Sequence, residues 1–237
     1  MSFLILIRHG QSIWNLENKF TGWVDVDLSE QGKIEAEKAG TLIKEKKIEI
    51  NFYYSSSQLR ANNTLKIMQN ILNDQKKFSK AWQLNERHYG SLTGLNKTEM
   101  VKKLGISKVH EFRRSWDTKP EPLDKKSPYH PLNIETYKEI PKNLIPDTES
   151  LKDTYDRVFK YFKKEIEEKL KEKNVLISAH GNSIRALCKY LFKLDNNQIS
   201  KLEIPTGNPL FIELNNKIEV MNCEYLDKDR SKDLLVF

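Results

Sequence analysis

Two histidines in this chain occupy the same local context. His9 follows the apolar residues of FLILIRHGQS, and His180 follows those of VLISAHGNS. Each histidine precedes a glycine and then a segment of helical periodicity. Short continuous apolar runs of this kind are typical of parallel strands that are buried on both faces. Ligands of α/β proteins bind at the carboxyl ends of such strands, so we expect both imidazoles to meet at one edge of a sheet.

The residues beside His9 favour phosphate chemistry. Arg8 adds a fixed charge with a planar fork that suits phosphate, and the helix that follows adds unpaired N–H groups. A neutral imidazole can attack phosphorus when cations surround the equatorial oxygens and a carboxyl group moves the proton. The pattern predicts phosphoryl transfer with His9 as nucleophile, and with Arg8, His180 and another arginine supplying charge.

Two other interpretations stay open on these residues alone. Each histidine could be an ordinary, partly buried residue at the end of a strand. A metal site would require a carboxylate or a further histidine at ligand spacing. The remaining histidines, His88, His110 and His130, lie in unrelated contexts, so we expect no metal.

The predicted elements that position these residues alternate between strands and helices. Strands are expected at Phe3–Ile7, Phe52–Tyr54 and Val175–Ser178. Amphipathic helices are expected from Ser29 to about Lys46, over 64–72, over 151–170 in about five turns, and over 184–192. This order predicts an α/β fold whose central, mostly parallel sheet is flanked by helices on both faces.

One stretch of the chain is rich in proline: six of the eight prolines fall between Pro120 and Pro146. Proline is incompatible with a continuous helix or a central strand. We therefore expect an irregular surface insertion at about 118–147, and a C-terminal tail at about 227–237, within a single domain that spans residues 1–237.

Composition narrows the class of protein. No apolar run approaches the ~20 residues that cross a bilayer, and the start of the chain lacks the features of a signal peptide. Cys188 and Cys223 form neither a disulfide framework nor a zinc spacing. The sequence predicts a reduced, cytoplasmic protein with no membrane partner.

The net charge is +7, from 40 Lys and Arg against 33 Asp and Glu. Such a balance suits either nucleic acid or small anionic ligands. The lysines are dispersed, and no basic block is interleaved with aromatic residues. We therefore expect small anions as ligands and no nucleic acid.

Several longer segments carry a resemblance to a known family. LIRHGQSIWNLENKFTGWVDVDLSEQG, LNERHYGSLTGLNK, FRRSW, AHGNSIRAL and IPTGNPL together closely resemble cofactor-dependent phosphoglycerate mutase. RHG alone would indicate only the broad histidine phosphatase superfamily, whereas FTGW, NERHYG and LNK are far more specific. The similarity runs from about Phe3 to about Leu226.

The resemblance implies an isomerase of glycolysis and gluconeogenesis. It would interconvert 3-phosphoglycerate and 2-phosphoglycerate through a phosphohistidine and a 2,3-bisphosphoglycerate intermediate. A trace of 2,3-bisphosphoglycerate would prime it, and no metal is implied. The alternative is a phosphatase that uses the same phosphohistidine on small phosphate esters and lets water compete with the acceptor.

The family's functional residues transfer to matching positions. The resemblance implies catalytic roles for His9, Glu86, His180, Arg8 and Arg60, with His9 as the phosphoryl carrier and Glu86 as the general acid and base. It implies substrate contacts for Ser12, Asn15, Thr21, Gly22, Arg87, Tyr89, Lys97, Arg113, Arg114, Gly181 and Asn182. Without the resemblance, Arg60, Arg113 and Arg114 would be interpreted as surface charges.

Two features of the family transfer less directly. Gln11 stands where the family often has Glu, and Leu16 stands where a basic residue is common. The family's contact surface between subunits lies around residues 52–82, from which we expect a homodimer. Tyr53, Phe78 and Trp82 in that stretch could equally belong to the core.

Overall fold

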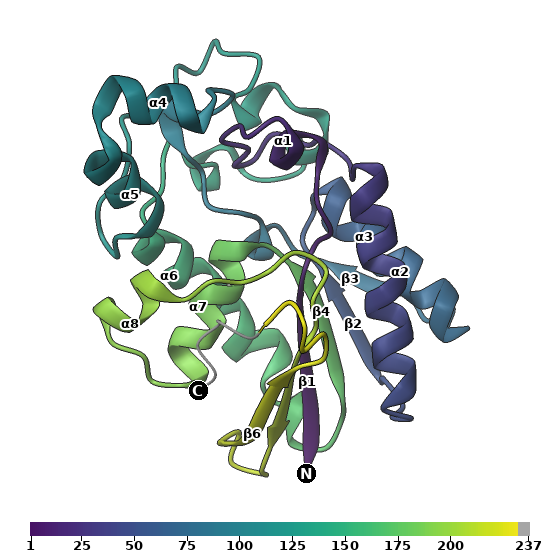
Figure 1. The fold of residues 1–237 in the computed structure, drawn as a ribbon. Coiled ribbons are helices and arrows are strands. Elements are labelled where there is room, and N and C mark those ends of the chain that lie inside the picture. The colour runs from purple at the N-terminus through teal and green to yellow at the C-terminus, as the bar shows by residue number, and fades with distance from the viewer. Residues whose placement is uncertain (232–237) are drawn as a thin grey trace.

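The computed structural model describes residues 1–231, and its centre is a six-stranded sheet (Figure 1). The strands lie in the order β3–β2–β4–β1–β5–β6. Their bounds are β1 Ser2–Arg8, β2 Phe52–Ser55, β3 Phe78–Lys80, β4 Val175–Ala179, β5 Leu210–Leu214 and β6 Val220–Tyr225. Strands β3, β2, β4 and β1 run parallel to one another, and β5 is antiparallel to β1 and β6. The predicted, mostly parallel sheet is confirmed.

Helices cover both faces of this sheet. The α-helices are α1 Ile13–Leu16, α2 Glu30–Glu45, α3 Leu59–Leu72, α4 Lys97–Leu104, α5 Ile106–Arg114, α6 Leu151–Tyr161, α7 Gly181–Leu191 and α8 Asn196–Lys201. Figure 1 shows α2 and α3 on one side of the sheet and α6 and α7 on the other. Within residues 1–231, no helix has the length and apolarity needed to span a membrane.

Strand β1 explains this layering, because its side chains alternate between two buried clusters. Leu4 and Leu6 belong to the cluster that includes the apolar residues of α6 and α7. Ile5 and Ile7 belong to the cluster that includes those of α2 and α3. All four side chains are at most 1% exposed, so the strand is fixed from both sides and its carboxyl end is held rigidly.

The pairing of β1 with β4 brings the two histidine motifs together. The strands are parallel and in a register that places Arg8 opposite Ala179. His9 and His180 each follow the last residue of their strand, and the His9 amide donates to the Ala179 carbonyl at 3.0 Å. The prediction that the two histidines end neighbouring strands is confirmed.

The helix that was predicted over 151–170 is not uniform. The α-helical part ends at Tyr161, and a π-helical segment, Phe162–Ile166, follows it. Val158, Phe162, Ile166 and Leu170 are all fully buried and lie four residues apart. In an α-helix each such step rotates a side chain by about 40° away from the preceding one. The wider π turn returns these residues to the core.

The proline-rich segment 118–147 contains short 3₁₀ turns, at Pro131–Asn133, Glu135–Tyr137 and Lys142–Leu144, in place of α-helices and strands. It runs over the upper end of the molecule in Figure 1. Two of its side chains, His130 and Tyr137, are nevertheless fully buried. The Tyr137 hydroxyl donates to the Trp23 carbonyl, so the insertion is anchored to the loop that precedes α2.

The predicted tail at 227–237 lies partly outside the described residues, since 232–237 are not among them. Its first residue, Asp227, is only 4% exposed. The carboxylate of Asp227 pairs with Lys38 at 2.6 Å and with Arg230 at 2.7 Å. The described beginning of the tail is therefore bound to α2.

Candidate active site

The two ring nitrogens of His9 have different neighbours. Nδ1 lies 2.7 Å from the Gly10 carbonyl oxygen. A carbonyl can only accept, so Nδ1 carries the hydrogen and Nε2 keeps its lone pair. Arg60 Nε donates to that Nε2 at 3.3 Å. Burial, and then the charges of Arg60 and Arg8, hold the pKa of His9 well below its usual range, so the ring is neutral and Nε2 can act as a nucleophile.

His180 lies against His9, with 4.9 Å between the ring centres. Its Nε2 is 2.8 Å from the Ser56 hydroxyl, and its buried Nδ1 makes no hydrogen bond within residues 1–231. Burial, followed by the nearby charge of Arg60, lowers the pKa of His180 well below its usual range. The two imidazoles are therefore both neutral, and Nδ1 of His180 is an unused hydrogen-bonding group beside His9.

Two arginines, the fully buried Arg60 and the partly buried Arg8, are held beside these rings by backbone carbonyls. Arg60 donates through Nη1 to the Val24 carbonyl and through Nη2 to the Gly22 carbonyl, both at 2.9 Å. Arg8 donates through Nη1 to the Ile204 carbonyl at 2.8 Å. The buried Nε of Arg8 has no hydrogen-bond partner among the described residues. Fixed, underused N–H groups of this kind suit an anion.

Glu86 is oriented through one of its two carboxylate oxygens. Its Oε1 accepts from the Arg87 amide at 2.7 Å, from Asn182 Nδ2 at 2.8 Å and from the Asn182 amide at 3.2 Å. A Cβ atom added at Gly181 would lie 3.8 Å from both Arg8 Nε and Glu86 Oε2. The second oxygen of Glu86 therefore faces the same space as Arg8, where it can exchange a proton with a ligand.

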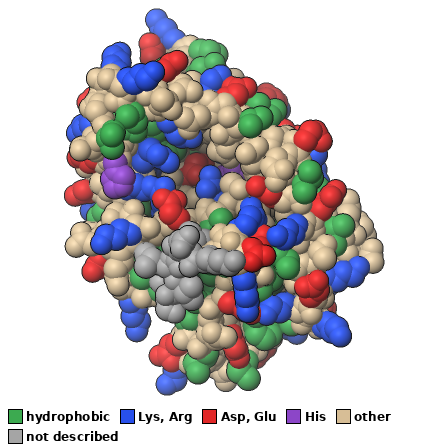
Figure 2. All heavy atoms as spheres, in the orientation of Figure 1, with side chains coloured by type: hydrophobic (Ala, Val, Ile, Leu, Met, Phe, Trp, Pro, Cys, Tyr) green, Lys and Arg blue, Asp and Glu red, His purple; other side chains and the backbone are tan. Residues whose placement is uncertain are grey.

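These groups line one cavity with a strongly positive wall. Its lining residues are Arg8, His9, Asn15, Lys19, Thr21, Gly22, Arg60, Glu86, Tyr89, Lys97, Arg113, Arg114, Gly181, Asn182, Arg185, Glu203 and Ile204. Seven of them are Lys or Arg and two are Glu. Figure 2 shows the hollow, with lysine and arginine side chains gathered around it. The cavity is thus built for an anion that carries more than one negative charge.

The cavity also perturbs its own ionisable groups. Burial, together with the charges of Arg113 and Arg8, lowers the pKa of Lys97 from its usual value. Burial alone would raise the pKa of Tyr89, but Arg87 and Arg113 outweigh it and the net shift is downward. Neighbouring positive charge adds to the effect of burial at Lys97 and outweighs burial at Tyr89, and an anionic ligand would relieve the repulsion between the cations.

Thirteen of the predicted site residues line this cavity, and three do not. Ser12 is fully buried and caps α1, where its hydroxyl accepts from the Asn15 amide. Arg87 is also fully buried, with its guanidinium carbon 4.7 Å from the centre of the Tyr89 ring. His180 is fully buried and its ring contacts that of His9. The structure places these three against the lining residues.

Sequence reasoning missed four lining residues: Lys19, Arg185, Glu203 and Ile204. Lys19 precedes FTGW by one residue and Arg185 lies in AHGNSIRAL, so the motifs themselves offered a signal for both. Glu203 and Ile204 precede PTG, in a segment that no helical or strand periodicity singles out. Among the described residues, no group of three or more His, Cys, Asp or Glu could hold a metal ion.

Comparison with known proteins agrees with this geometry. The family profile of the histidine phosphatase superfamily (branch 1) matches residues 4–130 and 124–217. A 2,3-bisphosphoglycerate-dependent phosphoglycerate mutase from Pelagibacter ubique (strain HTCC1062) is 69% identical over 238 residues, which is 100% of both chains. This chain belongs to the 2,3-bisphosphoglycerate-dependent phosphoglycerate mutase family.

Other members of this mutase family are similar along nearly their whole length. The mutase from Hydrogenobaculum sp. (strain Y04AAS1) is 48% identical, over 95% of this chain and 92% of the relative. Solved structures share the fold at lower identity. A mycobacterial glucosyl-3-phosphoglycerate phosphatase in complex with VO3 has a TM-score of 0.68 at 20% identity, over 90% of this chain and 93% of that one.

Proposed function

We propose that this chain interconverts 3-phosphoglycerate and 2-phosphoglycerate, with His9 as the phosphoryl carrier and 2,3-bisphosphoglycerate as intermediate and primer. Membership of the mutase family supports isomerisation over the phosphatase alternative. The observation that carries the residue assignment is a neutral imidazole, His9, whose Nε2 lies in a cavity with seven cationic side chains.

The first step is transfer of a phosphoryl group between His9 and a hydroxyl of the substrate. The Nε2–P bond of phosphohistidine breaks as the substrate oxygen–phosphorus bond forms, and the hydroxyl proton goes to Glu86. In the return step, Nε2 attacks the other phosphate of 2,3-bisphosphoglycerate, and Glu86 returns the proton to the oxygen that leaves. Glu86 suits this role because Oε1 is occupied by Asn182 and Arg87 while Oε2 faces the cavity.

The phosphoryl group needs positive charge around its equatorial oxygens. Arg8 Nε and the Arg60 guanidinium lie close to His9 and supply this charge, and the neutral His180 can add a hydrogen bond through Nδ1. Because these side chains already provide the charge, the proposed reaction requires no metal. Asn15 and Gly181, which line the same cavity, complete this end of the site.

The remainder of the ligand needs a second cationic region, for its carboxylate and its other phosphate. We assign this role to Lys97, Arg113 and Arg114, with Thr21, Gly22, Tyr89 and Asn182 as polar and packing contacts. Ser12 and Arg87 act on the ligand indirectly. Ser12 caps the helix that carries Asn15, and Arg87 packs against Tyr89.

The residue assignment can be tested directly on the covalent intermediate. The enzyme is mixed with 2,3-bisphosphoglycerate labelled with ³²P, and the protein is recovered in alkali, where phosphohistidine survives. We expect label on wild type that is lost in acid, and none on His9→Ala. Equal labelling of His9→Ala would contradict the assignment of the nucleophile.

The proposal extends to the domain organisation and the location of the protein. We infer a single domain over 1–237, because β1 and β5, from opposite ends of the chain, pair in one sheet. We infer a cytoplasmic location, since only two cysteines occur in 237 residues and glycolytic substrates are cytoplasmic.

We also infer a homodimer that uses the surface around 52–82. Tyr53 is 3% exposed and belongs to the core, and Phe78 packs against that core. Phe52 and Leu59 are 37% and 44% exposed, and β3 is an edge strand. These features are consistent with a surface that a second copy covers.

A further inference from the structure

Three consecutive residues, 202–204, each contact a different arginine of the cavity. The first and the third use their backbone carbonyls, which accept from Arg185 Nε at 2.7 Å and from Arg8 Nη1 at 2.8 Å. The middle residue, Glu203, instead uses its carboxylate, which pairs with Arg114. This segment therefore sets the position of three cations at once.

Glu203 differs from its neighbours because it brings a negative charge into a site for anions. Its second oxygen lies 3.8 Å from Arg185 Nη2. The side chains of Arg114 and Arg185 are only 13% and 5% exposed, whereas that of Glu203 is 54% exposed. The carboxylate thus lies at the mouth of the cavity and neutralises arginines that are themselves mostly buried.

The backbone of Glu203 is held by hydrogen bonds, whereas its half-exposed carboxylate is held, among the described residues, only by ion pairs with Arg114 and Arg185. Its carbonyl accepts from the Tyr225 hydroxyl at 3.3 Å, and the carbonyls on either side hold arginines. The side chain is half exposed and can rotate into solvent. The cavity's other carboxylate, Glu86, is held by Asn182 and Arg87. Only Glu203 of the two is placed to give way to a ligand.

We propose that Glu203 is a replaceable stand-in for the second anionic group of the ligand, and that it sets the affinity for ligands with two anionic ends. Its carboxylate keeps Arg114 and Arg185 in position in the empty site and is displaced when a ligand carboxylate or second phosphate arrives. This inference rests on the proposed function, which requires such ligands. Competition from Glu203 weakens the binding of these ligands. The bisphosphorylated intermediate can therefore dissociate from Arg114 and Arg185 and reorient within the site.

The test is a binding measurement in the His9→Ala background, where no phosphoryl transfer occurs. Isothermal titration gives Kd for 2,3-bisphosphoglycerate, 3-phosphoglycerate and inorganic phosphate, with and without Glu203→Gln. We expect Glu203→Gln to lower Kd for 2,3-bisphosphoglycerate roughly fivefold, because one competing charge is removed from a partly exposed pair. Inorganic phosphate, which needs only the His9 end, should gain less, and added salt should shrink the difference.

Matched variants separate charge from structure. Glu203→Asp keeps the charge and should keep the parental Kd, while Glu203→Ala should tighten binding as Glu203→Gln does. Glu219→Gln, an exposed carboxylate outside the cavity, should change nothing. Circular dichroism checks that each variant is folded.

Unchanged or weaker binding of 2,3-bisphosphoglycerate to both Glu203→Gln and Glu203→Ala would overturn the inference. It would mean that Glu203 serves only to position the arginines. Failure of the proposed function would look different, because wild type would then not interconvert the two phosphoglycerates at all.

Discussion

The chemistry of His9 depends on which of its nitrogens holds a hydrogen. The Gly10 carbonyl fixes the tautomer from one side, and Arg60 approaches Nε2 from the other. The same arginine that lowers the pKa of His9 would hold the phosphoryl group once it is attached. In the proposed reaction, burial and then Arg60 keep the His9 ring unprotonated before transfer, and Arg60 stabilises negative charge during it.

The proposed role of Glu86 in proton transfer predicts the effect of a single substitution. Glu86→Gln preserves an oxygen that can accept from Asn182 but removes the group that exchanges a proton. We expect kcat for isomerisation to fall by about 10² to 10⁴, with a much smaller change in KM. A coupled assay of phosphoglycerate isomerisation measures both constants.

The control for this substitution is Glu99→Gln, an exposed carboxylate on α4, which should behave as wild type. If Glu86→Gln retained full kcat, another group would have to carry the proton.

Most of the site residues could be predicted from the sequence, but the balance of positive and negative charges in the cavity could not. RHG, FTGW, NERHYG and the second HG identified residues that the structure brings into one cavity. Glu203 and Arg185 were missed because a charged residue in a loop or on a helix has the same local pattern whether it faces solvent or a cavity. The burial of Arg87 could not be predicted for the same reason, since it depends on how Arg87 packs against the Tyr89 ring.

At the scale of elements, the three central parallel strands β1, β2 and β4 were easier to predict than the rest of the sheet. The apolar runs of β1, β2 and β4 are continuous because helices cover both of their faces. Strand β5 is antiparallel and lies near the edge beside β6, and β3 has only three residues. The π segment after α6 was also missed, because a helical period indicates a helix without specifying its width.

The start of α2 packs backbone to backbone against the loop that holds His9. A Cβ atom added at Gly32 would lie 2.0 Å from the Gln11 carbonyl oxygen, and one added at Gly10 would lie 2.1 Å from the Gly32 carbonyl oxygen. Both glycines are therefore required by close approach, and the helix fixes the loop in place.

We predict that Gly32→Ala forces α2 away from this loop. The free energy of unfolding should fall by about 1–3 kcal/mol, as for other overpacked sites, and kcat should fall because His9 shifts from Arg60. Urea denaturation gives the first quantity and a coupled assay the second. Lys33→Ala, on the exposed side of the same helix, should change neither. A fully stable and active Gly32→Ala would show that the contact is not rigid.

For the whole molecule, buried neutral histidines link stability to pH. Burial, and then His130, lower the pKa of His88 to about 3, and the pKa values of His9 and His180 are also depressed. In the unfolded chain, these histidines have the usual side-chain pKa of about 6.5 and bind protons below that pH. In the folded chain they stay neutral until the pH is much lower. Stability is therefore fully present above that pH and is lost as the pH falls.

The prediction that follows concerns the slope of stability against pH. Between pH 6.5 and 5, each such histidine should lower the free energy of unfolding by up to about 1.4 kcal/mol per pH unit. His88→Gln should reduce the slope by one proton, whereas His110→Gln, at an exposed position, should leave it unchanged. Urea melts from pH 5 to 8 measure it. An equal slope in His88→Gln and wild type would contradict the account.

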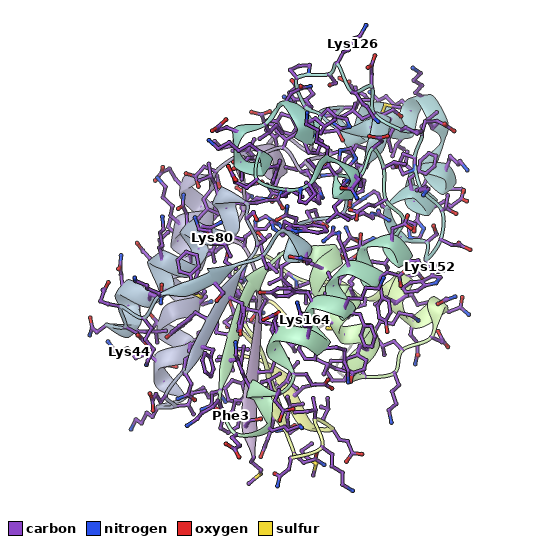
Figure 3. The ribbon with its side chains drawn as sticks, turned by 180° about the vertical axis from the view of Figure 1, so that it is seen from behind. Phe3, Lys44, Lys80, Lys126, Lys152 and Lys164 are labelled. Carbon is purple, nitrogen blue, oxygen red and sulfur yellow. The ribbon has the colours of Figure 1, made fainter. Side chains whose placement is uncertain are left out.

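The charge of the whole molecule has two parts. Lysines on the outside are scattered: Figure 3 shows Lys44, Lys80, Lys126, Lys152 and Lys164 at separate places on the surface. The concentrated positive charge lies in the cavity, where arginines dominate. The excess of Lys and Arg over Asp and Glu is therefore explained by a binding site for a small anion together with lysines dispersed over the solvated surface.

The central claim is that His9 carries a phosphoryl group between two phosphoglycerates. The measurement that tests it most directly is conversion of 3-phosphoglycerate to 2-phosphoglycerate by wild type and His9→Ala, with and without added 2,3-bisphosphoglycerate, in the presence of a chelator. We predict rapid conversion by wild type that depends on the primer, and none by His9→Ala. Release of inorganic phosphate with little isomerisation, or conversion that survives in His9→Ala, would contradict the claim.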